Sequence, residues 1–263
     1  MGKPERGGGA IKESENIANM FDGWYKTFEG AVENRVDWEL LKEYLPKNRN
    51  AKIWDAAGGT GRIALPLAKM GYPVTLCDIS TSMLYATKKK TLREKGVLNR
   101  VEILQCDIRS LSFANGSFDF VLCWDGAVEA AKELTRVVKK GGVVSLFLVN
   151  RCRGAIDLFS EDPKSALAII KSRCDFVRHH GEKYRAVNEG EARRLFEAEG
   201  IRIIAVYAVC GWMDVLKIGE KVRKSRVWKE EFLKETTQMV LKLTKEASVK
   251  GMARHLVLYG EKK

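Results

Sequence analysis

Acidic and amide side chains follow five short apolar segments, at the positions where buried strands would end. The segments 53–54, 74–77, 101–106, 118–124 and 143–149 are followed by Asp55, Asp78, Asp107, Asp125 and Asn150. Short runs rich in β-branched and aromatic residues, separated by helix-length stretches, are typical of parallel strands in an α/β sheet. Ligands of such sheets lie outside the carboxyl ends of the strands. These polar residues therefore predict a binding site.

A glycine-rich loop, residues 55–61, follows the first segment and indicates the kind of ligand. Residues 59–64 fit the G-x-G-x-x-A fingerprint of dinucleotide binding, with Asp78 about 20 residues further on, so an NAD enzyme is allowed. Asp55, however, would repel a pyrophosphate at the start of the next helix. A ligand with a ribose and a cationic amino end but no phosphate, such as S-adenosylmethionine, suits the loop better. Glycines let the backbone approach such a ligand closely.

The loop and the segments after it resemble the class I S-adenosylmethionine-dependent methyltransferases. The first motif of that family is D-x-G-x-G-x-G. It stands here as D-A-A-G-G-T-G, with Ala57 where the family usually has its first glycine. This variant is similar to the one in quinone-biosynthesis C-methyltransferases. The resemblance continues through C-D-I-S-T-S-M-L (77–84), Q-C-D-I (105–108), F-D-F-V-L-C-W-D-G (118–126) and L-T-R-V-V-K-K-G-G (134–142), and so covers residues 51–150.

The resemblance implies a cofactor site at the strand ends. Asp78 would accept two hydrogen bonds from the ribose hydroxyls, and Trp124 would close the site near the transferred methyl group. The other implied cofactor contacts are Asp55, Ala57, Gly58, Gly59 and Gly61 at the methionine moiety, Ile79, Met83, Asp107 and Ile108 at the adenine, and Cys106 and Cys123 at strand ends. The alternative is that the aspartates only cap the helices that follow them.

Residues 11–45 are expected to be helical up to Pro46, because apolar residues recur there at helical spacing. In the family, such an N-terminal helix covers the cofactor and often supplies an aromatic and a basic residue to its amino-acid end. Tyr25 and Arg35 are the candidates, and an arginine can hold a carboxylate bidentately. The alternative is an ordinary amphipathic helix with Arg35 in water. Residues 1–10 are expected to be disordered.

We expect one Rossmann-like, doubly wound α/β domain over residues 11–263, with a seven-stranded, mostly parallel sheet whose last strand is antiparallel. Its expected parts are a helical cover (11–50), a cofactor-binding half (51–150), acceptor-side additions (151–187 and 211–250) and a last strand (254–260). A helix over 191–199 and a sixth strand over 201–209 lie between the additions. By the family's topology the additions lie above the strand ends, so acceptor specificity is expected there.

The composition agrees with a cytoplasmic enzyme domain. The hydrophobic content is 45%, which supports a full core. No apolar run is long enough to span a bilayer or to form a signal core. The six cysteines contain no C-x-x-C pair, so we expect no metal site and no disulfide framework, in a reducing compartment.

Positive charge is concentrated in the second half of the chain. Residues 1–150 carry 22 Lys and Arg against 18 Asp and Glu, whereas residues 151–263 carry 24 against 16. The densest stretch contains Trp228 among Lys217, Lys221, Arg223, Lys224, Arg226 and Lys229. A basic face with an aromatic residue over a catalytic mouth suits a nucleic-acid backbone or another polyanion. The alternative is a solvated, lysine-rich surface.

A second resemblance also concerns RNA. The segments I-W-D-A-A-G-G-T-G, V-T-L-C-D-I-S and G-G-V-V-S-L-F-L-V-N, with M-A-R-H-L-V-L-Y-G-E-K (252–262), are similar to bacterial tRNA methyltransferases that esterify the carboxyl group of carboxymethoxyuridine at the wobble position. In that group a basic residue of the N-terminal helix and one in the tail serve the ligands. Arg35 and Arg254 are the matching positions, and Arg254 would then add to the basic surface that faces RNA.

Methyl transfer from a sulfonium needs chiefly the alignment of acceptor, methyl group and sulfur. A base matters only when the acceptor must lose a proton. Asp125 at a strand end and His180 in the first addition are candidates, with helix capping and a surface loop as the alternatives.

The leading expectation is a methyltransferase acting on a small-molecule acceptor. A tRNA-modifying methyltransferase is the alternative, and a non-catalytic S-adenosylmethionine or NAD binding protein is the remote one.

Overall fold

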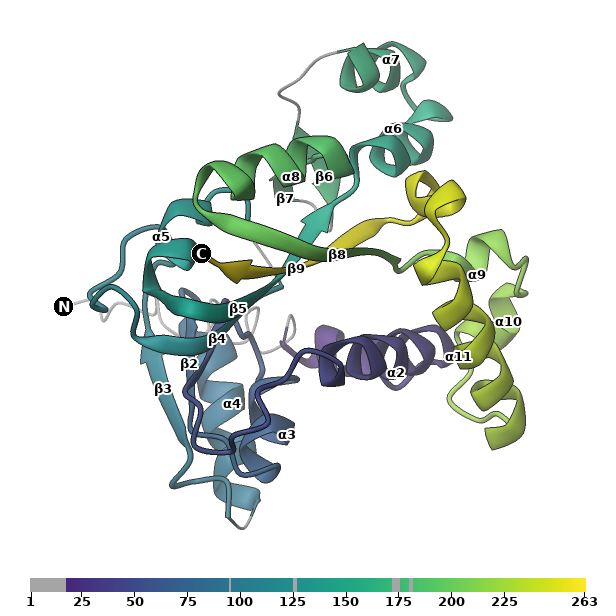
Figure 1. Ribbon diagram of the computed structural model, residues 1–263. Coiled ribbons are helices and arrows are strands. Elements are labelled where there is room, and N and C mark those ends of the chain that lie inside the picture. The colour runs from purple at the N-terminus through teal and green to yellow at the C-terminus, as the bar shows by residue number, and fades with distance from the viewer. Residues whose placement is uncertain (1–17, 95, 125–126, 172–175, 180–181) are drawn as a thin grey trace, which may run out of the picture.

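The computed structural model describes residues 18–94, 96–124, 127–171, 176–179 and 182–263. Its strands are β1 (Ile53–Ala56), β2 (Val74–Asp78), β3 (Val101–Gln105), β4 (Phe118–Cys123), β5 (Val138–Val149), β6 (Phe176–His179), β7 (Glu182–Arg185), β8 (Ile201–Val209) and β9 (His255–Lys262). Seven of them form one sheet in the order β3-β2-β1-β4-β5-β9-β8 (Figure 1). Strands β1 to β5 run parallel, and β9 is antiparallel to both β5 and β8. The expected doubly wound sheet is confirmed.

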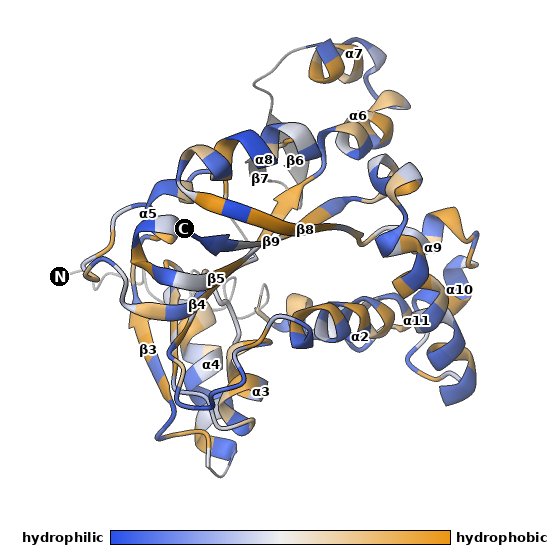
Figure 2. Ribbon diagram, in the orientation of Figure 1, coloured by the Kyte–Doolittle hydropathy of each residue, from blue (hydrophilic) through white to orange (hydrophobic). Residues whose placement is uncertain are grey.

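The sheet is covered on both faces, and each face has its own hydrophobic cluster. One cluster includes residues of α2 (Phe28–Lys42), α3 (Ala64–Lys69), α4 (Thr81–Arg93) and α11 (Glu230–Lys245), and the other includes residues of α5 (Ala131–Val137) and α8 (Glu189–Ala198). Strand residues alternate between the faces, so Ile53 lies in the first cluster and Trp54 in the second. The central strands accordingly carry apolar residues toward both faces, with a few polar residues among them (Figure 2).

The carboxyl ends of the central strands lie level with one another. Ala56, the last residue of β1, pairs in register with Cys77 of β2 and with Cys123 of β4. The residues just beyond these pairs therefore meet at one edge of the sheet. This edge holds the glycine loop on one side and Trp124 on the other.

The N-terminal cover is two helices, whereas the sequence predicted one. Residues 18–24 are helical, 25–27 form a turn, and α2 begins at Phe28. The Thr27 side chain caps α2 by accepting a hydrogen bond from the Gly30 amide at 3.2 Å. A side chain at Gly30 would place its Cβ 2.2 Å from the Trp24 carbonyl oxygen. Glycine at this position therefore permits the turn. Residues 11–17 of the predicted helix lie outside the described residues.

The predicted bounds of the later elements need small corrections. Strand β5 begins at Val138, five residues before the predicted start, and β9 begins one residue late and ends at Lys262. The first addition contains α6 (Arg151–Phe159), α7 (Pro163–Lys171) and the unpredicted hairpin of β6 and β7. The second contains α9 (Trp212–Val215), α10 (Glu220–Arg223), α11 and the 3-10 helix η1 (Ala247–Met252). None of the described helices is long and apolar enough to cross a membrane.

Candidate functional site

Two buried carboxylates hold the glycine loop from its two flanks. Asp55, at the end of β1, accepts a hydrogen bond from the Ala64 amide at 3.1 Å. Asp78, at the end of β2, accepts from the Gly59 amide at 2.9 Å and from the Ser80 amide at 2.8 Å. Asp78 therefore supports the loop and also bends the chain into α4. Both predicted acidic residues face the loop at which they were expected.

The loop backbone enters the left-handed region three times. Ala57, Gly59 and Gly61 have φ angles of 55°, 54° and 79°. Ala57 is thus a non-glycine residue in a conformation that favours glycine, at a cost of about 1 kcal/mol. It stands where the resembled family usually has glycine. A Cβ at Gly58 would lie 2.8 Å from a methyl group of Leu76, so the loop can pack this closely on β2 only without a side chain there.

The first helical segment is fastened to the glycine loop by a polar cluster that the sequence did not indicate. Asp22 accepts a hydrogen bond from the Thr60 hydroxyl at 2.7 Å. Lys90 of α4 bonds to Asp22 at 2.7 Å and donates to the Thr60 carbonyl at 3.0 Å. This cluster positions residues 18–24 over the loop. No local motif marks it, because its three members come from different elements.

Arg62, immediately after the loop, is the cation at the centre of the site. Its Nη1 donates to Asn34 at 3.1 Å and to Asp37 at 3.0 Å, both on α2. The guanidinium carbon lies 4.4 Å from the centre of the Tyr25 ring and 5.2 Å from the centre of the Trp124 ring. Arg62 thereby joins two aromatic residues that the sequence assigned to one site. Sequence reasoning missed Arg62, since it follows the D-x-G-x-G-x-G motif and occupies an unspecified position of the G-x-G-x-x-A fingerprint.

Arg35, the predicted basic partner of Tyr25, lies elsewhere. Its Nη2 forms an ion pair with Glu230 of α11 at 2.7 Å, and its side chain is 40% exposed. The structure therefore places Arg62, rather than Arg35, against Tyr25. Trp124 is also held by β5, because its ring nitrogen donates to the Ser145 hydroxyl at 2.9 Å.

The residues predicted at the adenine end follow β2 and β3. Asp107 forms an ion pair with Arg109, whose Nε lies 2.9 Å and 3.1 Å from the two carboxylate oxygens of Asp107. This contact lowers the Asp107 pKa to about 2. Ile79 is exposed, while Met83, Cys106 and Ile108 are half-buried and Cys123 is buried. Asp125 and His180, the predicted bases, lie outside the described residues.

Burial sets the electrostatics of the site. Loss of solvent raises the pKa of Asp55 to about 7, although the nearby positive charge of Arg62 opposes this. Burial, followed by the charge of Glu29, likewise raises the pKa of Glu33 to about 7. Glu33 accepts from the Trp24 ring nitrogen and from the Gly211 amide, each at 3.3 Å. Asp55 of β1 and Glu33 of α2 therefore both have pKa values near neutral pH.

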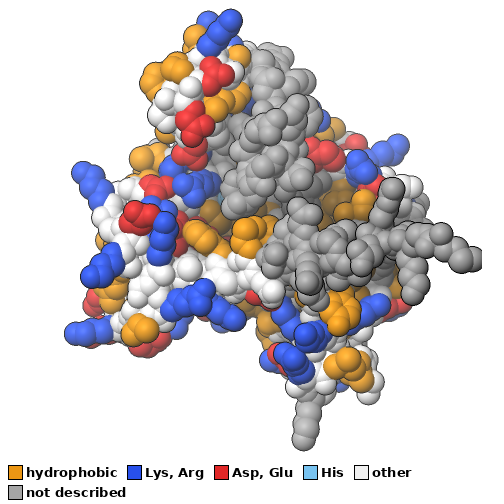
Figure 3. Space-filling view, turned by 180° about the vertical axis from the view of Figure 1, so that it is seen from behind, with side chains coloured by type: hydrophobic (Ala, Val, Ile, Leu, Met, Phe, Trp, Pro, Cys, Tyr) orange, Lys and Arg blue, Asp and Glu red, His pale blue; other side chains and the backbone are white. Residues whose placement is uncertain are grey.

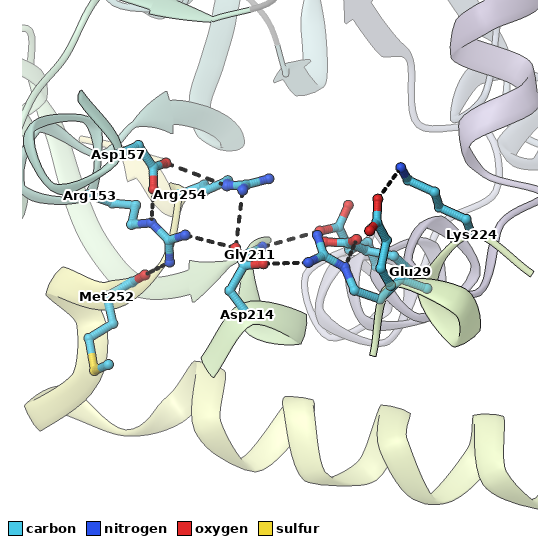
Figure 4. A network of polar contacts seen from close by, with 11 residues as sticks. Glu29, Arg153, Asp157, Gly211, Asp214, Lys224, Met252 and Arg254 are labelled. Atoms are coloured by element: carbon cyan, nitrogen blue, oxygen red, sulfur yellow. Dashed lines mark hydrogen bonds and ion pairs between the residues drawn. The ribbon is translucent and has the colours of Figure 1, made fainter. Parts of the chain in front are cut away.

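Asp214 of α9 is the centre of an ion network beside the site (Figure 4). It bonds to Arg223 of α10 at 2.6 Å, Arg153 of α6 at 2.8 Å and Arg254 at 3.1 Å. Arg223 also binds the buried Glu29 of α2 at 2.8 Å. Two of the basic residues predicted to face RNA, Arg223 and Arg254, are therefore engaged within the protein.

Comparison with known proteins agrees with this architecture. Residues 53–142 match the family model of the methyltransferase domain. The chain is 27% identical over 146 residues to the tRNA 5-carboxymethoxyuridine methyltransferase of Escherichia coli, covering 52% of this chain and 56% of that protein. It is 33% identical over 103 residues to the C-methyltransferase UbiE of ubiquinone and menaquinone biosynthesis from Pectobacterium carotovorum, covering 36% and 41%. The aligned segments thus span about half the length of these relatives.

Among solved structures, the chain is similar to an S-adenosylmethionine-dependent methyltransferase from Methanosarcina mazei. The TM-score is 0.55 at 18% identity, covering 85% of this chain and 96% of that one. The fold is that of the class I S-adenosylmethionine-dependent methyltransferases, and residues 53–142 match the methyltransferase domain in sequence. Within that class its relatives include both the tRNA-modifying enzyme and the quinone enzyme named above.

Proposed function

We propose that this protein transfers a methyl group from S-adenosylmethionine to a small-molecule acceptor. The observation that carries the proposal is the pair of buried carboxylates, Asp55 and Asp78, at the carboxyl ends of β1 and β2. They lie beside a glycine loop whose backbone has positive φ angles. Asp78 offers hydrogen-bond acceptors to a ribose, and Asp55 offers a negative charge to an ammonium group. The sulfonium, when bound, supplies an activated methyl group, so the protein has chiefly to align the acceptor.

The charges of the second addition support the small-molecule acceptor over RNA. Arg223 and Arg254 are neutralised by Asp214 and Glu29, and Lys224 pairs with Glu220. On the face shown in Figure 3, the described Lys and Arg side chains are interleaved with acidic ones. Phosphate binding needs cations whose charge is not already compensated. An uninterrupted basic track therefore does not form among the described residues seen there.

The cofactor assignment predicts the effect of Asp78→Ala. Removing this carboxylate should weaken binding of S-adenosylhomocysteine by about 2 kcal/mol, since its two acceptor oxygens are lost. Because Asp78 also holds the Gly59 amide, the thermal midpoint of each variant should be measured alongside the calorimetric titration. An unchanged affinity in the variant, or tighter binding of NAD than of S-adenosylhomocysteine by the wild type, would refute the assignment.

The raised pKa of Asp55 predicts that cofactor binding depends on pH. An ammonium ligand needs Asp55 ionised, and a carboxyl with a pKa of about 7 loses its charge as the pH falls through that value. The affinity for S-adenosylhomocysteine should therefore drop about tenfold between about pH 8 and about pH 6. Asp55→Asn should bind more weakly with no such dependence. A flat calorimetric profile in the wild type would contradict this prediction.

The acceptor class can be tested on the exposed cations. Lys221, Arg226 and Lys229 are exposed and have no ion pair among the described residues, so reversing all three to Glu should not disturb the fold. With a small-molecule acceptor, the wild type should show no saturable tRNA binding at moderate salt, and the triple variant should keep its cofactor affinity. Tight, salt-sensitive tRNA binding that the variant loses, and that a matched reversal of Lys88, Lys89 and Arg93 keeps, would favour the RNA alternative.

A further inference from the structure

The Arg62 guanidinium is held firmly but retains unused hydrogen-bond donors. Its Nη1 bonds to Asn34 and Asp37 of α2, and the rings of Tyr25 and Trp124 lie near it. The side chain is 21% exposed. Neither Nε nor Nη2 donates a hydrogen bond to any residue that the structure describes. Nε and Nη2 are not among the buried polar atoms that lack a partner, so both donors remain accessible. A guanidinium that is held in place with two accessible donors can bind a ligand from outside the described chain.

The planar shape of a guanidinium decides what that partner can be. An arginine presents five donors in a fixed fork, and its flat faces stack on aromatic rings. Here Nη1 is committed to α2, and aromatic rings lie against the cation. The remaining fork, made by Nε and Nη2, is the geometry that binds a carboxylate through two parallel hydrogen bonds.

Asp55 supplies the opposite charge at the other end of the glycine loop. One of its oxygens accepts from the Ala64 amide, and the other has no donor among the described residues. The charge of Arg62 lowers the Asp55 pKa against the effect of burial, so the two groups interact. An α-amino acid carries an ammonium and a carboxylate on one carbon. Asp55 and Arg62 flank a loop whose backbone can approach a ligand closely. Their opposite charges match the ammonium and the carboxylate of such a zwitterion.

We propose that Arg62 binds the carboxylate at the amino-acid end of the cofactor. This inference rests on the proposed function and replaces Arg35, which pairs with Glu230, in that role. Tyr25 and Trp124 then act on the cofactor through Arg62, because they stack against the cation and fix the direction of its free fork. Asp37 fixes the same cation from α2.

Two ligands that differ only at the amino-acid end test the inference. S-adenosylhomocysteine has the carboxylate, whereas 5′-methylthioadenosine has the same nucleoside and a thioether sulfur without it. In calorimetric titrations, Arg62→Met should bind S-adenosylhomocysteine about 10- to 100-fold more weakly and methylthioadenosine within about twofold of wild type. Arg62→Lys keeps the charge but loses the fork, and should show a smaller loss of the same selectivity. Arg35→Met should bind both ligands as wild type does.

The other outcomes overturn the inference in distinguishable ways. Equal losses for both ligands in Arg62→Met and Arg62→Lys would show that Arg62 only holds the cover in place. A selective loss in Arg35→Met would return the carboxylate to Arg35. Unchanged binding of S-adenosylhomocysteine in Arg62→Met, with methyl transfer abolished, would assign the fork to an acceptor carboxylate. A wild-type protein that binds neither ligand would refute the proposed function itself. If Arg62→Met fails to fold, Arg62→Lys decides among these outcomes.

Discussion

Replacing Asp214 with alanine is expected to lower the free energy of unfolding by about 3 kcal/mol. One carboxylate accepts from three guanidiniums, Arg153, Arg223 and Arg254. Its loss would leave three partly buried positive charges close together without their shared partner (Figure 4). The buried Glu29 would still pair with Arg223, but Arg223 would have lost its second carboxylate partner. Because the network joins α2, α6, α9, α10 and the residue just before β9, the packing of these elements against one another should weaken.

Urea denaturation with a fixed transition slope would measure this loss. Asp157→Ala is the matched control, because Asp157 contacts Arg153 at 2.6 Å and Arg254 only at 3.6 Å and is 43% exposed. The control should cost about 0.5 kcal/mol or less. Equal effects of the two substitutions would show that the network does not depend on Asp214. Asp214→Asn should fall between the wild type and the alanine variant, since the amide can still accept hydrogen bonds.

Gly30→Ala is expected to release the N-terminal cover from the glycine loop. The added Cβ would lie 2.2 Å from the Trp24 carbonyl oxygen, 2.7 Å from its carbonyl carbon and 2.8 Å from the Tyr25 Cα. All three atoms belong to the backbone, so the turn at 25–27 must open. Tyr25 would then leave Arg62, and Asp22 would leave Thr60. We expect a loss of about 2 kcal/mol in stability and at least about tenfold in affinity for S-adenosylhomocysteine.

Gly23→Ala provides the matched control seven positions earlier. Nothing lies within 4 Å of a Cβ built at Gly23, and alanine favours the helix in which it stands. This variant should bind the ligand as wild type does and be slightly more stable. Limited proteolysis would report the release directly, since cleavage near Tyr25 should accelerate only in Gly30→Ala. Equal proteolysis of both variants would contradict the role given to the turn.

The strands were the most predictable part of the fold, because their signal is local. The predicted sixth strand coincides with β8, and the five earlier runs all became strands. A buried parallel strand must be apolar on both faces, so its sequence differs sharply from that of the helices around it. The early start of β5 was missed because residues 138–142 contain two lysines and two glycines.

The break between residues 24 and 28 was not predictable from periodicity. Apolar residues keep helical spacing through it, and only the close approach of Gly30 to Trp24 requires the turn. The contacts of Arg62 were missed for a related reason. Its partners Tyr25, Asp37 and Trp124 lie 37, 25 and 62 positions away, and no spacing rule connects them. Long-range contacts of this kind depend on the fold as a whole.

The basic residues of the second half show why net charge alone is a poor guide to a partner. Arg223 and Arg254 contribute to the positive charge of the second half, yet both neutralise carboxylates inside the protein. A net charge counts ionised groups without regard to whether they face solvent or one another. The glycine loop could be located from the sequence for the opposite reason, since its motif consists of consecutive residues.

The position of β9 has a consequence for the order in which the chain can fold during synthesis. Strand β9 lies between β5 and β8 and is the partner through which β8 joins the sheet. It also leaves the ribosome after both of them. Until residues 255–262 have emerged, the nascent chain presents the free edges of β5 and β8, and such edges recruit other strands. The parallel half can assemble early, but closure of the sheet waits for translation of its last strand.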